Sequence, residues 1–315
     1  MLEFLALCLP IFAVVFVGLG AARADKVSAA AVDVIGLFAF NVALPAMLFR
    51  LMAQQPLAES FQADFFLGYL GACLLLFGGV TLIAKAGARE RQRAAALGAA
   101  ATMGNVGYLA PPLLLPILGP RVAGPVAMAI IAEVAVIIAL GSVLMTRGTV
   151  PGAGLATAWI GLKGLARNPV ILTVIAGALF AATSLPIPPL LDRFLLFLGG
   201  AAGPTALFAL GGTLGRLSVR RDLVLISGAA TAMKLVAYPA LMYVTLGWLM
   251  GLDRVWVLAG VLLAAMPTAT NAFVLAQRNG AGVEEVSATV MLSTLLAAIA
   301  FPATAWLLSA PLSPP

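Results

Sequence analysis

Histidine is absent from this 315-residue sequence, and both cysteine and charge are scarce. Without histidine, His-ligated metal sites and His-dependent catalytic triads are excluded. The two cysteines, Cys8 and Cys73, lie inside apolar segments and predict neither a disulfide framework nor a metal site. Charged residues make up 10% of the chain, against roughly 25% in a soluble globular domain. Such a chain cannot cover a water-facing surface with charge.

Long apolar runs take the place of the missing charge. Hydrophobic residues make up 63% of the chain, and six runs without a charged residue have the roughly 20 residues that cross about 30 Å of hydrocarbon as a helix. The runs are Phe65–Ala84, Ala94–Pro120, Pro169–Leu191, Phe194–Gly215, Val255–Gln277 and Val286–Pro315. A membrane β-barrel would show shorter, alternating segments, so the sequence predicts an all-α polytopic membrane protein.

The pattern of basic residues predicts how the chain is threaded through the membrane. We predict ten spans, at about residues 3–22, 29–51, 64–84, 93–118, 122–146, 169–185, 191–215, 222–247, 254–277 and 285–309. Thirteen Lys and Arg residues fall in the odd-numbered loops and four in the even-numbered ones. Because cytoplasmic loops carry the excess of positive charge, both termini are expected outside the cytoplasm, in a bacterial-type inner membrane. The net charge of +6 is spread over these loops and forms no single basic patch, so a nucleic-acid partner is not expected. Membrane lipid is the expected partner of these basic residues.

The first span and the longest loop carry two further expectations. The charges Arg23 and Lys26 follow the first apolar run, which predicts a retained helix and not a cleaved signal peptide. A link at 147–168 separates five spans (1–146) from five more (169–315), and it suits either a short interfacial helix or a plain linker. An odd number of spans in each half predicts two inverted five-helix repeats.

Predicted helices four and nine contain interruptions. Two glycines and two prolines fall within Gly104–Pro112, and a proline with three polar residues falls within Met266–Phe273. Broken backbone at membrane depth occurs only inside protein or beside a cavity, and exposed helix ends attract ions. Either break alone could be a harmless kink, but two at equivalent places favour a transport site. Asn41 and Pro45 form a third interruption, for which a kink with a locally bonded asparagine is the simpler interpretation.

Two ionisable residues, Glu133 and Lys234, lie near the middle of apolar spans. A charge at that depth costs roughly 3 kcal/mol or more, so it normally faces a partner or a cavity. Three interpretations stay open: the two residues pair with each other, Lys234 faces an anionic substrate or supports its site, or Glu133 exchanges protons.

Several motifs together resemble the auxin efflux carrier family, whose bacterial branch includes malonate-permease-like proteins. They are Asn41-x-x-x-Pro45, Gly104-Asn105-Val106-Gly107 followed by prolines, Lys234-Leu235 with Pro239, and Met266-Pro267-Thr268-Ala269-Thr270-Asn271-Ala272. The resemblance implies ten transmembrane helices with a fold similar to that of the bile-acid/sodium symporters. Helices 1, 2, 6 and 7 would form a scaffold, and helices 3–5 and 8–10 a transport domain that moves as an elevator. It also implies a homodimer. The link is too short for a plant-type regulatory loop, which makes auxin itself a doubtful substrate.

The resemblance further implies that broken helices 4 and 9 cross at Pro111 and Pro267, with the carboxylate of the substrate beside Asn105 and Asn271. The predicted substrate-binding residues are Gly104, Asn105, Tyr108, Pro111, Lys234, Pro267, Thr268, Thr270 and Asn271, with Glu133 as the coupling or ion-pair candidate and Asn41 and Pro45 as secondary candidates. No cofactor and no metal site are expected, although a proton or sodium ion could couple transport.

The favoured function is alternating-access transport of a small organic anion by a protein that is not an enzyme. One alternative is a sodium-coupled symporter of the bile-acid type, which would need polar and acidic groups around the crossing. Another is a membrane receptor or scaffold that binds its ligand without moving it.

Overall fold

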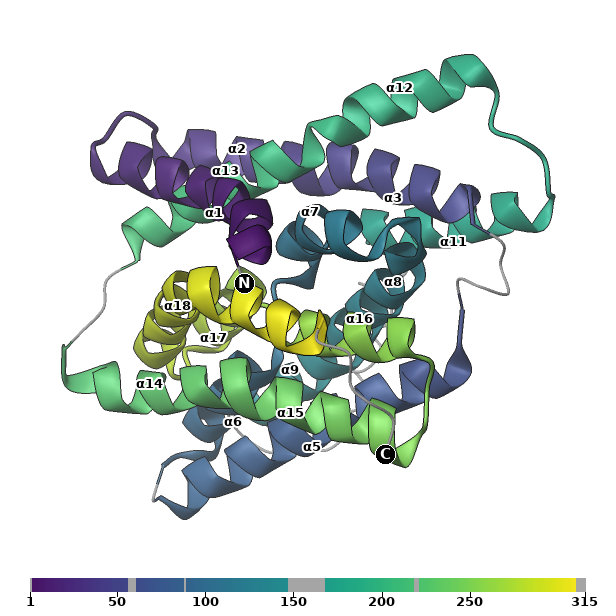
Figure 1. The fold of residues 1–315 in the computed structure, drawn as a ribbon. Coiled ribbons are helices and arrows are strands. Elements are labelled where there is room, and N and C mark those ends of the chain that lie inside the picture. The colour runs from purple at the N-terminus through teal and green to yellow at the C-terminus, as the bar shows by residue number, and fades with distance from the viewer. Residues whose placement is uncertain (1, 56–60, 88, 147–167, 218–220, 310–315) are drawn as a thin grey trace.

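The computed structural model contains helices and no strand in the residues that it describes, which are all except 1, 56–60, 88, 147–167, 218–220 and 310–315 (Figure 1). Six described segments are long and apolar enough to cross a membrane, namely Leu2–Arg23, Ala29–Ala53, Ala63–Ala86, Pro189–Arg216, Val224–Leu249 and Val283–Leu308. Four shorter apolar helices accompany them. The chain is therefore an all-helical, multi-pass membrane protein. Except for Asn168, the predicted link lies outside the described residues.

Helices occupy the residues predicted as spans in the first half, several of them in pieces. The elements are α1 (Leu2–Arg23), α2 (Ala29–Phe38), the π-helical turn η1 (Ala39–Ala43), α3 (Leu44–Ala53), α5 (Ala63–Ala86), α6 (Arg91–Thr102), α7 (Val106–Leu118), the short η2 (Pro120–Val122), α8 (Ala123–Ile131), the π-helical turn η3 (Ala132–Ile137) and α9 (Ile138–Met145). The predicted fourth span is thus two half-helices, α6 and α7. The third interruption, at Asn41, is a π-helical turn and not a break.

The described part of the second half is also helical. Its elements are α11 (Pro169–Ala182), α12 (Pro189–Gly200), α13 (Ala202–Arg216), the short η4 (Arg221–Leu223), α14 (Val224–Ala232), the π-helical turn η5 (Met233–Ala237), α15 (Tyr238–Tyr243), the π-helical turn η6 (Val244–Leu249), α16 (Arg254–Ala264), α17 (Thr270–Asn279) and α18 (Val283–Ser309). The predicted ninth span is the pair of half-helices α16 and α17.

Local chemistry sets several of these boundaries. The side chain of Asn168 accepts hydrogen bonds from the N–H groups of Val170 and Ile171, at 3.0 and 3.4 Å, and caps the start of α11. Pro45 follows the π-helical turn η1 within the continuous helical span Ala29–Ala53, where it lacks the N–H group that would donate to a carbonyl of the preceding turn. Gly280 ends α17 in the left-handed conformation, with φ of 60°, which a glycine adopts without a steric penalty.

The helices form two groups (Figure 1). One group comprises α1, α2, α3, α11, α12 and α13, in which α1 and α2 pack on α13, and α11 and α12 pack on α3. The other comprises α5, α6, α9 and α14 to α18, in which α5 packs on α6 and α14 packs on α18. Helices α7 and α8 lie between the groups and contact both. The main core cluster contains residues of both groups and of α7 and α8, and two smaller clusters lie beside it.

Glycines allow the closest contact of the first group, between α1 and α13. Gly18 on α1 and Gly211 on α13 lie so close to the other helix that a Cβ on either would overlap a backbone carbonyl oxygen, that of Phe208 or Val15. A Cβ on Gly215 would lie 2.8 Å from the Leu19 oxygen. Small residues of this kind drive helix association in membranes, where apolar burial between helices gives little.

The substitution Gly211→Val is expected to destabilise the protein by about 3 kcal/mol, because the backbone oxygen of Val15 cannot move out of the way as a side chain would. Thermal unfolding in detergent measures the loss. Gly20→Val on α1 is the matched control, since no atom lies within 4 Å of a Cβ at that position. Equal losses in the two variants would contradict the proposed close contact.

Candidate functional site

The two breaks cross each other through backbone hydrogen bonds. Gly104 and Thr268 form an isolated antiparallel bridge. The Asn105 N–H donates to the Pro267 carbonyl at 2.8 Å, and the Ala269 N–H donates to the Met103 carbonyl at 3.0 Å. Each break thus satisfies backbone groups of the other, as buried irregular backbone in a membrane protein requires.

The prolines of the first break are not part of this crossing. The chain leaves the helical conformation only at Met103–Asn105, and both Pro111 and Pro112 lie inside α7. The expected crossing at Pro111 is therefore corrected to Gly104, while Pro267 does lie in the crossing segment. Proline restricts the chain at its own position and just before it, so a glycine and an asparagine further upstream provide the freer place for the break.

Two helices begin at the crossing without side-chain caps. The first turn of α7 starts at Val106 and that of α17 at Thr270, and neither preceding residue caps its helix with a side chain. The leading N–H groups of an α-helix have no acceptor within the helix, and the helix dipole places partial positive charge there. Two such ends side by side form a natural site for an anion.

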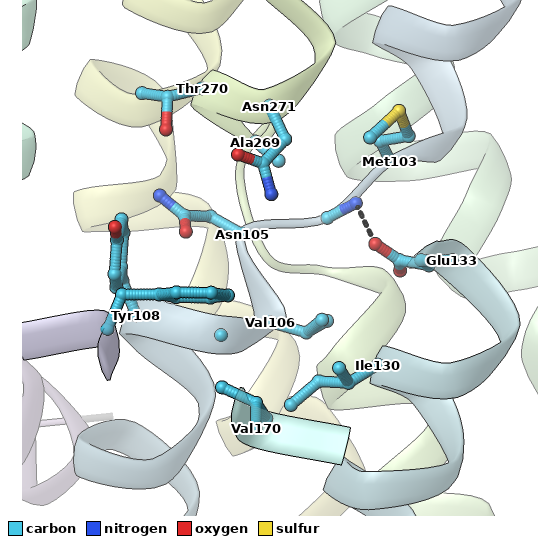
Figure 2. Close-up of a pocket in the computed structure, with 13 residues that line it drawn as sticks. Met103, Asn105, Val106, Tyr108, Ile130, Glu133, Val170, Ala269, Thr270 and Asn271 are labelled. Atoms are coloured by element: carbon cyan, nitrogen blue, oxygen red, sulfur yellow. Dashed lines mark hydrogen bonds between the residues drawn. The ribbon is translucent and has the colours of Figure 1, made fainter. Parts of the chain in front are cut away.

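A pocket of about 40 Å³ lies at these helix ends (Figure 2). Its lining is Phe40, Met103, Gly104, Asn105, Val106, Gly107, Tyr108, Ile130, Glu133, Val170, Ala269, Thr270 and Asn271. Phe40 lies in η1, between α2 and α3, and Val170 lies in α11, so both belong to the first helix group. The other lining residues lie in or beside α7, α8 and the second group, so the pocket lies where the two groups meet. A water molecule needs roughly 10–15 Å³ of such volume, so the space holds about three heavy atoms, the size of one carboxylate.

Two asparagines reach this pocket from the two crossing segments (Figure 2). Asn105 is 4% exposed, and its amide nitrogen has no hydrogen-bond partner within the described part of the chain. Asn271 is exposed, so the pocket reaches the surface of the molecule beside this residue. A buried donor without a partner costs about 1–3 kcal/mol, which an oxygen of a bound anion would offset.

Glu133 holds the first break in place. Its carboxylate accepts a hydrogen bond from the Gly104 N–H at 2.9 Å and another from the Tyr69 hydroxyl at 2.8 Å. In Figure 2 its side chain reaches the crossing segment from η3, on the side opposite Tyr108. The carboxylate therefore fixes the backbone beside the pocket as well as contributing to its lining.

Lys234 lies behind the crossing and does not line the pocket. It is fully buried, and its ammonium group donates to the Thr102 and Ala264 carbonyls, both at 3.1 Å. These carbonyls belong to the last residues of α6 and α16, where the helix dipoles place partial negative charge. The ammonium also lies 4.4 Å from the centre of the Tyr238 ring. One cation thus stabilises the ends of both half-helices.

Glu133 and Lys234 both occupy π-helical turns, η3 and η5 respectively. Such turns often occur at functional sites because they change the direction of a side chain locally. No ion pair joins the two side chains in the structure as described, although a Cβ on Gly104 would lie 3.1 Å from the Lys234 ammonium and 3.3 Å from a Glu133 oxygen. The two charges flank the same glycine.

The structure brings five of the nine predicted binding residues to the pocket: Gly104, Asn105, Tyr108, Thr270 and Asn271. Thr268 instead bonds the crossing to its surroundings, donating from its hydroxyl to the Ala100 carbonyl at 2.8 Å and from its N–H to the Ser293 hydroxyl at 3.0 Å. Pro111, Pro267 and Lys234 do not line the pocket, and neither do Asn41 and Pro45. The role of each in binding stays a prediction.

Sequence reasoning missed the apolar side of the pocket. Phe40 packs edge-on against Tyr108, with ring centres 6.2 Å apart, and Val170 and Ile130 complete this side. Phe40 directly precedes the noted Asn41, but Val170 and Ile130 carry no signal, since they resemble the other apolar residues of their helices.

A multi-pass helical fold with crossed, broken helices around a small pocket is the architecture of a membrane transporter. The sequence model of the family described as "Membrane transport protein" matches residues 4–150 and 155–305. The chain is 35% identical over 298 residues to the "Putative malonate transporter" of Rhizobium meliloti (strain 1021), covering 94% of this chain and 93% of that protein. This chain belongs to the membrane transport protein family, that is, the auxin efflux carrier family.

Proposed function

We propose that the protein is a secondary transporter that moves a small organic carboxylate across a bacterial inner membrane by alternating access. The observation that carries the proposal is the pocket at the crossing, where two uncapped helix N-termini accompany the unpartnered amide of Asn105. Anion binding there satisfies donors that otherwise stay unpaired. The name of the Rhizobium relative supports a small dicarboxylate such as malonate as the first substrate to test.

The two helix groups supply the parts that move. The predicted scaffold corresponds to α1, α2, α3 and α11 to α13, and the predicted transport domain to the remaining helices. Since Phe40 and Val170 of the scaffold cover the pocket, sliding of the transport domain in an elevator motion would uncover it. The pocket holds about one carboxylate, so a whole dicarboxylate requires such an opening.

Helix pairing supports two inverted repeats within ten spans. The first predicted span, α1, packs on α13 of the seventh, and the sixth, α11, packs on α3 of the second. Exchanging the two halves converts one pair into the other, as a pseudo-two-fold axis demands. The Gly104–Thr268 bridge lies where that axis would pass. The outside location of both termini follows from loop charge, and the homodimer stays a prediction from the family resemblance.

Sodium coupling receives less support than the anion site. Carbonyl groups at the ends of broken helices are the usual ligands for sodium in such folds. Here the carbonyls of Thr102 and Ala264 already accept hydrogen bonds from the Lys234 ammonium. We therefore expect transport without a sodium requirement.

Proteoliposomes containing the purified protein are expected to accumulate radiolabelled malonate above protein-free liposomes and to exchange it for unlabelled malonate. Replacing sodium by potassium is expected to leave uptake unchanged. Monocarboxylates and other dicarboxylates, added as competitors, define the substrate class. Saturable binding of an organic acid without any flux or exchange would identify a receptor and contradict the proposal. Flux that stops without sodium would favour the symporter alternative.

A further inference from the structure

A second cavity, separate from the transport pocket, lies between α5 and α14 on the outer face of the second helix group. It is a groove of about 290 Å³, and α6 forms its floor. The lining is Val80, Ile83 and Ala84 of α5, Leu97 of α6, Leu225, Ile226, Ala229 and Ala230 of α14, Met233 of η5, and Arg89. Every lining residue except Arg89 is apolar.

The groove opens towards the space that lipid occupies around the protein. Leu225 and Ile83 on its two walls are 85% and 68% exposed, whereas Leu97 on the floor is 4% exposed. Figure 1 shows α14 and α6 next to each other at the edge of the molecule, away from α1 and α13. Ile83 and Leu225 can therefore contact a molecule that lies in the groove on Leu97.

The dimensions of the groove suit a hydrocarbon chain of one leaflet. From Leu225 to Met233 the helix rises about 12 Å, close to half of the roughly 30 Å of bilayer hydrocarbon. The end of the groove at Leu225 lies near the connection between α5 and α6, which holds Arg89. This connection is one of the loops rich in basic residues, which face the anionic cytoplasmic leaflet.

Arg89 places its guanidinium group in the lining at that end. Its neighbours in sequence are already engaged: Arg91 donates to the Thr146 carbonyl at 3.0 Å, and Arg93 pairs with Glu285. No hydrogen bond or ion pair joins Arg89 to any part of the chain that the structure describes, and no acidic residue lines the groove. A guanidinium without a partner is well suited to the bidentate recognition of a phosphate.

We propose that this groove binds one anionic phospholipid of the cytoplasmic leaflet, with an acyl chain between α5 and α14 and the headgroup phosphate on Arg89. The lipid would connect α5 of the first half to α14 of the second, which otherwise meet through α6. It would thereby stabilise the second helix group as a unit. The binding needs no transport activity, so it is tested separately from the proposed function.

Native mass spectrometry of the full chain in detergent, titrated with dioleoyl phosphatidylglycerol or dioleoyl phosphatidylcholine, tests this site. One phosphatidylglycerol is expected to stay bound under conditions that remove phosphatidylcholine. Arg89→Gln is expected to weaken phosphatidylglycerol binding about fivefold, since one basic residue near a lipid surface contributes about that much. Ala229→Trp, which fills the groove, is expected to weaken the binding of both lipids.

Two matched variants serve as controls. Arg23→Gln removes an exposed arginine outside the groove, and Ala13→Trp enlarges an exposed alanine on α1, so neither should change phosphatidylglycerol binding. Soluble glycerol 3-phosphate should not compete, because the acyl chain contributes to binding. Equal retention of the two lipids by the wild type would overturn the proposal. An unchanged affinity of Arg89→Gln for phosphatidylglycerol would also overturn it, as would an equal loss of affinity in Arg23→Gln. Both outcomes can be read even if Ala229→Trp does not fold.

Discussion

Replacing Asn105 by aspartate is expected to reduce malonate uptake in proteoliposomes about a hundredfold at low substrate concentration. The variant replaces a buried amide donor by a negative charge at the site proposed for the carboxylate of the substrate. A hydrogen bond to a charged group contributes about 1.5–3 kcal/mol, and repulsion between like charges adds to its loss. Asn105→Ala removes only the donor, so a loss of about tenfold is expected for it.

Thermal unfolding in detergent separates a loss of binding from a loss of folding in the aspartate variant. A carboxylate just before the first turn of α7 interacts favourably with the helix dipole, which offsets part of the cost of burying its charge, so uptake is expected to fall by more than the loss of stability explains. Asn168→Asp is the matched control, because that residue also precedes a helix but accepts hydrogen bonds and does not line the pocket. If Asn105→Asp transported like the control, the anion site would have to lie elsewhere.

Replacing Lys234 by methionine is expected to lower the free energy of unfolding by about 3–5 kcal/mol, the range for removing one partner of a buried charge cluster. The substitution leaves the Thr102 and Ala264 carbonyls without their donor and deprives Glu133 of the nearby cation. Both half-helices would lose the charge that stabilises their ends. Thermal unfolding in detergent measures the loss, and transport should fall with it because the crossing loses its support.

The double variant Lys234→Met with Glu133→Gln tests whether the two charges are coupled. It removes both, so it is expected to lose less stability than the sum of the two single variants. Lys26→Met is the control, since Lys26 is exposed. Strictly additive losses would mean that the two side chains act independently, although both lie beside Gly104. A Lys234→Met variant as stable as the wild type would contradict the capping role altogether.

Much of the fold follows from the sequence. In hydrocarbon every backbone N–H and C=O group must be bonded within the chain, so long apolar runs have little alternative to helices. Gly104 and Pro267 interrupt two of these runs, and the helices are in fact interrupted beside them. The family resemblance, and not this reasoning, implied Asn105 and Asn271 as binding residues, and the structure places them at the starts of α7 and α17.

The arrangement of the site required the tertiary structure. Lys234 bonds to Thr102, 132 residues away in the sequence, and Phe40 and Val170 reach the pocket from helices of the other group. Helical periodicity assigns a residue to a face of its helix, but in a chain this apolar nearly every face is apolar, so it does not say which face meets which neighbour. Pro111 illustrates the same limit: it resembled a helix breaker, yet it lies within α7.

The sequence by itself determined that the protein is a multi-pass helical membrane protein with two interrupted helices and two buried charges, because hydrocarbon excludes the alternatives. The tertiary structure decided that the breaks cross at Gly104 and Thr268, and that Lys234 supports the crossing from behind. The physical reason lies in how buried polar groups are satisfied. A buried polar group must find a partner, but only the packing of distant helices decides which one is within reach.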